Sequence, residues 1–229
     1  MKKKILVIDI GGTNVKMMIS RQNRRKFKSG PKMTPREMMA QIKTELEDWK
    51  YDAVAIGFPA PVRDGRILNE PKHLGKGWVR FNFEKTLGKP VRIVNDAVLQ
   101  ALGSYRGGRM LFLGLGTGLG STLVLRDMVL PLELGDLPYR DRRIIEDFLG
   151  KPGISELGHK EWEREVMFAV GQLKKSLIAD YLVLGGGNAK ELSELPEDAE
   201  LGHNRNAFLG GVRLWQNDPA TRRPRWKIF

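Results

Sequence analysis

The 229-residue chain contains no cysteine and only three histidines, His73, His159 and His203. The absence of cysteine excludes disulfide bonds and thiolate zinc sites, and so few histidines argue against a multi-histidine metal centre. No apolar run approaches the roughly 20 residues that cross a bilayer. The apolar stretch near the start breaks at Asp9 and enters a glycine turn, which predicts a strand rather than an export signal. We therefore expect a cytoplasmic protein without a membrane partner.

Acidic residues are in the minority: the chain has 27 Asp and Glu and 39 Lys and Arg, which gives a net charge of +12. Such a balance favours a polyanionic partner, whether a nucleotide, polyphosphate, nucleic acid or an acidic membrane surface, and does not choose among them. Apolar residues make up 41% of the chain, enough for a substantial core. The 26 glycines are clustered, which indicates backbone turns built around a ligand.

The apolar pattern predicts alternating strands and helices. Strands are expected at 4–10, 15–20, 53–58, 90–94, 110–115, 120–125 and 181–184, and helices at 34–49, 97–105, 162–177 and 207–215. Each half opens with a strand, a glycine turn and a returning strand, which suggests two similar halves with two phosphate-facing loops across a cleft. The basic stretch 21–28 is predicted to be an exposed hairpin or a solvated turn. The tail from Asp218 is predicted to be loosely ordered.

The first candidate phosphate loop is DIGGTN, which begins at Asp9. Gly11 and Gly12 let backbone amides approach a phosphate closely, and Thr13 adds a hydroxyl donor. Asp9, at the end of a strand, could hold Mg²⁺ through water, and Lys16 could add positive charge. A tight hairpin without a ligand is the alternative, but the flanking Asp and Thr favour phosphate binding.

Two further glycine-rich turns follow apolar strands. Alternating glycines in a strand are unfavourable unless the backbone bends around something such as a phosphate. A glycine turn that opens a helix suits a nucleotide, although an ordinary strand-to-helix turn has the same pattern. The first of these turns contains Gly116, Thr117 and Gly118, and the second contains Gly185, Gly186 and Gly187.

Acidic side chains at two other places could take part in a reaction. Asp96 follows Asn95 at the end of a predicted strand, where ligands of open α/β sheets bind, and its carboxylate could accept a hydroxyl proton. From the residues alone, a helix N-cap is the better explanation of this Asp. Glu133, Asp136 and Glu146 could accept hydrogen bonds from sugar hydroxyls. In so basic a chain, their spacing alone favours surface counter-charges.

Taken in order, seven segments resemble the ROK family of sugar kinases, within the superfamily of sugar kinases, Hsp70 and actin. They are DIGGTN at 9–14, GFPAPV at 57–62, NDA at 95–97, LGLGTGLGS at 113–121, ELGD at 133–136, IEDFLG at 145–150 and LGGGNAK at 184–190. The resemblance is nearest to glucokinases and polyphosphate glucokinases. It implies an α/β, two-lobed, actin-like (ribonuclease H-like) ATPase fold, with residues 1–99 in the N-terminal lobe and 100–229 in the C-terminal lobe.

The resemblance also implies transfer of a phosphoryl group from ATP or polyphosphate to a hydroxyl of a hexose, with Mg²⁺ and with glucose as the expected sugar. Asp96 would be the general base. The sugar would be bound by Asn95, Glu133, Asp136, Glu146 and Pro59. The nucleotide and its phosphates would be held by Asp9, Gly11, Gly12, Thr13, Lys16, Gly116, Thr117, Gly118, Gly185, Gly186 and Gly187. A homodimer is implied as well, and nucleic acid is disfavoured as a partner.

Three departures from the family pattern bear on these expectations. Asp136 stands where the family has His, and an ionised Asp accepts but does not donate a hydrogen bond, so the sugar contact would differ. The segment PYRDRRII at 138–145 lies where the family has a cysteine-rich zinc site, so no zinc is expected. The chain is also short for the family and lacks the length for a helix-turn-helix domain, which disfavours a DNA-binding repressor.

Two other functions stay open. A sensor that binds nucleotide or sugar without turnover would fit the change at Asp136. A basic nucleic-acid-binding protein could use the 21–28 run or the 222–227 tail, which includes Trp226, but that reading leaves the glycine loops unexplained. The net positive charge has two interpretations of equal weight. It could form a groove that binds polyphosphate, or it could be spread over the surface and aid solubility. The candidates for such a groove are Lys72, Lys76, Arg106 and Arg109.

Overall fold

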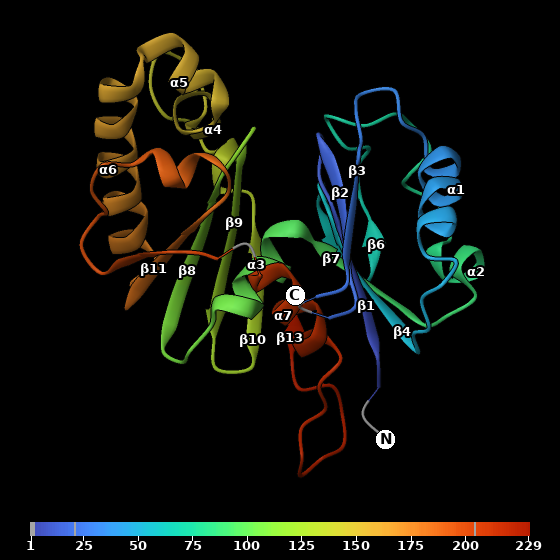
Figure 1. The fold of residues 1–229 in the computed structure, drawn as a ribbon. Coiled ribbons are helices and arrows are strands. Elements are labelled where there is room, and N and C mark those ends of the chain that lie inside the picture. Colours follow the sequence, from blue (N-terminus) through green and yellow to red (C-terminus); the bar gives the residue numbers. More distant parts are fainter. Residues whose placement is uncertain (1–2, 21, 204) are drawn as a thin grey trace.

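The computed structural model describes residues 3–20, 22–203 and 205–229, and in it two mixed β-sheets stand side by side with two helices between them (Figure 1). The first sheet has the strand order β3-β2-β1-β4-β7. Its central strand β1 pairs antiparallel with β2 and parallel with β4. The strands are β1 (Ile5–Ile10), β2 (Asn14–Met18), β3 (Arg24–Lys28), β4 (Ala53–Phe58) and β7 (Val91–Asn95).

The outer face of the first sheet is covered by α1 (Pro35–Glu45) and α2 (Phe83–Leu87), and the small hairpin β5 (Val62–Arg63) and β6 (Arg66–Ile67) lies beyond β4. The predicted start of α1 is confirmed, because Thr34 and Glu37 form a reciprocal capping box and Pro35 occupies the first turn. The helix ends earlier than predicted. The Leu46 N–H bonds to the carbonyls of both Ile42 and Lys43, which tightens the last turn and closes the helix.

The second sheet repeats the order of the first. Its order is β12-β11-β8-β9-β10-β13, and β10-β9-β8-β11-β12 matches β3-β2-β1-β4-β7 in the direction of each pairing. The pattern of two similar halves that the sequence suggested is therefore confirmed, with β13 added at one edge. The strands are β8 (Arg109–Leu115), β9 (Leu119–Leu125), β10 (Met128–Leu132), β11 (Tyr181–Gly185), β12 (Ala199–Leu201) and β13 (Lys227–Ile228).

Helices cover the outer face of the second sheet, where leucines of β8 pack against a fully buried Trp162. The longest helix begins at His159, three residues before the predicted start. The helices are α4 (Ile145–Leu149), α5 (Lys151–Leu157) and α6 (His159–Ser176), and the short 3-10 helices η1 (Leu134–Asp136) and η2 (Asn188–Glu191) complete this half. No helix in the described residues is both long and apolar enough to cross a membrane.

The central layer consists of α3 (Asp96–Ser104) and α7 (Asn206–Leu214), which Figure 1 shows between the two sheets. The two helices cross in backbone contact. A Cβ added at Gly103 would lie 1.9 Å from the Asn206 carbonyl oxygen, and one at Gly210 would lie 1.7 Å from that of Leu99. Because α3 contacts strands of both sheets, it does not belong to one half alone, and the division of the chain at residue 99 stays a prediction.

The structure also decides two predictions about surface segments. The prediction of a loosely ordered tail is wrong, because Trp226 is buried edge-on against Tyr105 and β13 pairs with β10. For the basic stretch near residue 21, the hairpin is confirmed and the solvated turn is wrong, because β3 pairs antiparallel with β2 and its Phe27 is buried in the core of the first sheet. Arg21 itself lies outside the described residues.

Candidate active site

Asp96 lies where the two sheets meet. It is the first residue of α3 and directly follows β7. A Cβ added at Gly57 in β4 would lie 3.2 Å from the Cα of Asp96, and one at Gly120 in β9 would lie 3.1 Å from the Cβ of Ala97. The start of α3 is therefore held between a strand of each sheet, and both strands have glycine at the point of contact.

The carboxylate of Asp96 is not needed as the helix cap. Asn95 is the N-cap, and its Oδ1 accepts a hydrogen bond from the Ala97 N–H at 2.9 Å. The Oδ1 of Asp96 shares the same N–H at 2.8 Å. The N-cap explanation that the residues alone favoured for Asp96 therefore applies to Asn95, and the second carboxylate oxygen of Asp96 remains for other partners.

The electrostatic surroundings of Asp96 suit proton exchange near neutral pH. Burial raises the pKa of its carboxyl to about 7, and the negative charges of Asp9 and Glu133 add to this rise. The hydrogen bond from Ala97 acts in the opposite direction and is too weak to cancel it. A carboxyl group with such a pKa gains and loses its proton readily in the physiological range.

The three acidic residues of the ELGD and IEDFLG segments converge. Glu133 precedes η1, Asp136 ends it, and Glu146 lies in the first turn of α4, where its Oε2 accepts a hydrogen bond from the Leu119 N–H at 3.1 Å. Burial raises the pKa of Glu133, the charges of Asp136 and Glu146 raise it further, and Lys72 opposes them. These residues therefore form one acidic cluster, and they are not counter-charges scattered over the surface.

Lys72 is a site residue that sequence reasoning placed elsewhere. Its Nζ lies 3.2 Å from the Oε1 of Glu146 and 3.5 Å from the Oδ1 of Asp136. Burial alone would lower the pKa of Lys72, but its contacts with these two acids outweigh that effect and raise it. The partners are 74 and 64 residues away in the sequence, so no local pattern could have revealed them. The only sequence feature that could have pointed to a cation at this place was Asp136, which replaces the family His.

The first glycine loop closes tightly above a buried carboxylate. The Gly11 N–H donates to the Asn14 carbonyl at 3.0 Å, and Thr13 at the tip is exposed. Asp9 is 9% exposed, and its Oδ2 lies 3.4 Å from the Nζ of Lys16. A paired carboxylate and ammonium group therefore adjoin the loop, and phosphate binding there stays a prediction.

Gly12 also connects the first loop to the loop that carries Lys72. A Cβ at Gly12 would lie 2.6 Å from the Cβ of His73. The neighbourhood of the first loop and the acidic cluster are thus joined through adjacent residues, His73 and Lys72. The segment between β6 and α2 is consequently part of the site.

The other two glycine turns lie against each other. The Nδ2 of Asn188 donates to the Gly116 carbonyl at 2.9 Å, and the Lys151 N–H donates to the carbonyls of Gly116 and Thr117 at 3.0 and 3.3 Å. A Cβ at Gly118 would lie 2.3 Å from the Oε2 of Glu146. The second loop therefore has Glu146 on one flank and the third turn on the other.

Packing alone requires glycine at two positions of the third turn. A Cβ at Gly185 would lie 2.6 Å from the Phe112 ring, and one at Gly186, whose φ is +84°, would lie 2.1 Å from the Leu115 carbonyl oxygen. Only Gly187 has open space around it. The helix that this turn was expected to open is the short 3-10 helix η2. Nucleotide binding at this turn therefore stays a prediction.

The remaining predictions concern Pro59 and the four cations that were suggested for a polyphosphate groove. Pro59 follows β4, and the next carbonyl, that of Ala60, accepts from the Nδ2 of Asn95 at 3.4 Å, so Pro59 borders the start of α3. Arg109 begins β8, whereas Gly116 follows its end, so the two lie more than about 20 Å apart along the strand. The four cations suggested for a polyphosphate groove consequently do not form one groove, because Arg109 is remote and Lys72 is paired with acids.

Comparisons with known proteins agree on one family and one fold. The ROK family model matches residues 5–130, more than half of the chain. A glucokinase from Pyrobaculum calidifontis is 27% identical over 171 residues, an alignment that covers 69% of this chain and 56% of that protein. The chain thus spans little more than half the length of this curated relative.

Solved structures of similar size share the whole fold. An inorganic polyphosphate/ATP-glucomannokinase from Arthrobacter sp. strain KM is similar with a TM-score of 0.78 at 21% identity, over 91% of this chain and 96% of that one. A ROK family glucokinase from Streptomyces griseus, in complex with glucose and AMPPNP, has a TM-score of 0.72 at 17% identity, over 91% and 98%. At these identities the likeness establishes the two-lobed, actin-like fold.

Proposed function

The chain belongs to the ROK family, and on that premise we propose that it is a kinase that transfers a phosphoryl group from ATP or polyphosphate to a hydroxyl of a hexose. The observation that carries the proposal is Asp96, held between the two sheets with its pKa raised to about 7. Asp96 would accept the proton of the attacking hydroxyl. A carboxylate with this pKa is a stronger base than an ordinary Asp and is still largely ionised above neutral pH.

The sugar would lie against the acidic cluster. Glu133, Asp136 and Glu146 present carboxylate oxygens that accept hydrogen bonds from hydroxyl groups. Lys72, paired with two of them, supplies the donor that an ionised Asp136 lacks in the position of the family His. The glucokinase and the glucomannokinase to which the chain is similar support a hexose, with glucose as the first choice.

The donor would approach from the glycine loops. The first loop and the turn at Gly116–Gly118 offer backbone amides for phosphate groups, and the turn at 185–187 would border the nucleoside. The AMPPNP complex and the polyphosphate/ATP enzyme among the similar structures support ATP, with polyphosphate as the second donor. Phosphoryl transfer depends mainly on positioning and charge neutralisation, and the loops and Asp96 would position donor and acceptor.

Mg²⁺ is expected with such a donor, and the residues present fit it. Asp9 is a buried oxygen donor whose charge destabilises the ionised form of Asp96, so a cation beside Asp9 would relieve this repulsion. In the described part of the chain no three His, Asp or Glu side chains are grouped to hold a metal alone. Asp9 would therefore hold the ion through water, with phosphate oxygens completing the shell. When bound, Mg²⁺ neutralises negative charge on the transferred group.

The test is a coupled turnover assay that crosses a panel of hexoses with ATP and polyphosphate in the presence of Mg²⁺. We expect sugar phosphate to form with the wild type and to disappear in Asp96→Asn. Because the base must be deprotonated, kcat/KM should rise roughly tenfold between pH 6 and pH 8, as expected for a group with a pKa of about 7 in the free protein.

The matched control is Asp64→Asn, an exposed Asp in the turn between β5 and β6, which should leave turnover unchanged. Absence of turnover with every sugar, while sugar or ATP still binds in calorimetry, would contradict the kinase and support a sensor that binds without reaction. Turnover that survives in Asp96→Asn would contradict the role of the base.

A further inference from the structure

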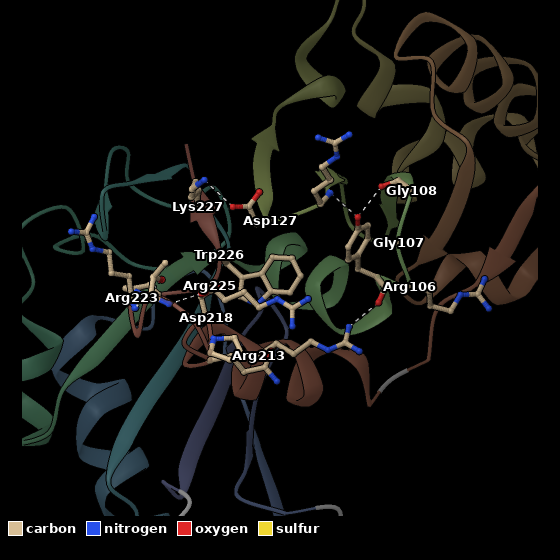
Figure 2. A pocket seen from close by; sticks show the side chains of 16 residues that line it. Arg106, Gly107, Gly108, Asp127, Arg213, Asp218, Arg223, Arg225, Trp226 and Lys227 are labelled. Atoms are coloured by element: carbon tan, nitrogen blue, oxygen red, sulfur yellow. Dashed lines mark hydrogen bonds and ion pairs between the residues drawn. The ribbon is translucent and has the colours of Figure 1, made fainter.

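A second charged region lies at the end of α3 that is remote from Asp96. A pocket of about 1380 Å³ opens there between the end of α3, the turn between β9 and β10, the end of α7 and the C-terminal tail (Figure 2). The nine residues of α3 separate it from Asp96 by about 13 Å along the helix. Of the residues named as candidates for binding the sugar or the donor, only Arg106, from the suggested polyphosphate groove, lines this pocket.

The pocket is strongly basic. Two acidic residues also line it, Asp127 and Asp218, so positive charge exceeds negative charge by four. Asp127 is already paired with a lysine at 2.8 Å, and Asp218 accepts hydrogen bonds from the backbone N–H groups of Ala220 and Thr221. The basic residues are Arg106, Arg126, Arg213, Arg223, Arg225 and Lys227.

Four of the arginines have no acidic partner. Arg106 pairs with Glu200, and Lys227 pairs with Asp127. Within residues 3–20, 22–203 and 205–229, no carboxylate forms an ion pair with the other four basic side chains. An exposed salt bridge is worth little, but four unpaired guanidinium groups around one pocket form a positive site.

Two of these arginines are fixed near each other. The Arg213 guanidinium donates to the carbonyl of Tyr105 at 2.9 Å and to that of Leu102, both at the end of α3. Arg225 lies over the Trp226 ring at 5.2 Å, and Figure 2 shows both arginines beside that ring. Burial lowers the pKa of Arg213, and the nearby charge of Arg225 lowers it further. An anion between these two groups would remove this repulsion.

We propose that this pocket binds an anion with several phosphate groups, separate from the donor at the glycine loops. Guanidinium groups bind phosphate oxygens with paired, directed hydrogen bonds, which suits arginine rather than lysine as the dominant cation. Trp226 is 8% exposed, so its ring offers no platform for a stacked base. Stacking on aromatic rings is a main source of affinity for single-stranded nucleic acid, and its absence favours a compact oligophosphate.

The experiment uses the full chain with tripolyphosphate as the probe. Calorimetry measures the affinity, and hydrogen–deuterium exchange locates the protected segments. We expect binding that protects segments 105–108, 126–127 and 213–227. Arg223→Gln combined with Arg225→Gln should weaken binding at least about tenfold, equivalent to about 1.4 kcal/mol. Arg223→Gln alone should also weaken it. Because the Arg223 side chain is exposed and forms no hydrogen bond or ion pair in the described part of the chain, we expect this variant to fold normally.

The control is Arg36→Gln combined with Lys160→Gln, two exposed positions on α1 and α6 that remove the same charge and should leave binding unchanged. A parallel titration with a hexose bisphosphate tests whether the natural ligand is an organic or an inorganic phosphate. The compound that binds more tightly identifies the class of ligand. Equal weakening by both double variants would overturn the proposal, as would protection limited to the glycine loops. Tighter binding of a DNA oligonucleotide with the same protected segments would assign the pocket to nucleic acid instead.

Discussion

Asp96→Asn is expected to stabilise the fold while it abolishes turnover. The folded protein ionises Asp96 with difficulty, because burial raises the pKa of the carboxyl from 3.8 to about 7. In the unfolded chain the same group ionises at its ordinary pKa, so the charged form favours unfolding. Asn carries no charge, and its Oδ1 can still accept the hydrogen bond that Ala97 donates at 2.8 Å.

The stability gained in Asp96→Asn is expected to increase with pH. The folded state holds its proton more tightly, so the free energy of unfolding is unaffected below pH 3.8 and decreases as pH rises from 3.8 to about 7. At pH 8 both states are ionised, and the penalty reaches about 4 kcal/mol. At pH 5 the folded carboxyl is largely protonated, and the penalty is only about 1.7 kcal/mol. These values are upper limits for the gain in Asp96→Asn.

The assay is urea unfolding of the wild type and Asp96→Asn at pH 5 and pH 8, followed by circular dichroism. We expect the variant to be more stable at pH 8, with an advantage over the wild type that shrinks by about 2.6 kcal/mol at pH 5. Asp64→Asn, at an exposed position, should show no such dependence. If Asp96→Asn is less stable at pH 8, or if its advantage is the same at both pH values, the inferred burial of charge at Asp96 is refuted.

Three other substitutions test separate contacts. Gly118→Ala would place a Cβ 2.3 Å from the carboxylate of Glu146, and KM for the sugar should rise roughly tenfold in steady-state kinetics, whereas Gly171→Ala, in open space, should not change it. Thr34→Ala removes the capping box of α1 and should lower the free energy of unfolding by about 1 kcal/mol in urea titrations. Trp162→Phe removes an indole donor from a buried carbonyl 3.0 Å away and should cost about 1–3 kcal/mol in the same assay.

Local patterns predicted the elements that frame the site. Apolar runs located the central strands of both sheets, and a Thr and a Glu three residues apart marked the start of α1. These features depend on neighbours within a few residues, which is why they can be read from sequence. The edge strands β12 and β13 were not predicted, nor was β10 beside β13, because a short strand at or near a sheet edge is defined by its partners rather than by its own pattern.

The sequence named the residues of the candidate site, whose roles stay predictions, but it did not predict their electrostatic surroundings. Asp96 was identified, but the helix cap that seemed to explain it belongs to Asn95. Glu133, Asp136 and Glu146 were identified as sugar ligands through the family resemblance, while their spacing favoured surface counter-charges. Their convergence on Lys72 became evident only in three dimensions.

The sequence by itself determined where the backbone must turn closely, because glycine alone tolerates those approaches, and it determined which strands are buried and that the chain has two similar halves. The tertiary structure decided the chemistry of the side chains. Asp96 has a pKa of about 7 because the fold withdraws it from solvent and places Asp9 and Glu133 nearby, and Lys72 meets acids 64 and 74 residues away. A pKa and an ion pair depend on burial and distance, and neither quantity is defined until the chain has folded.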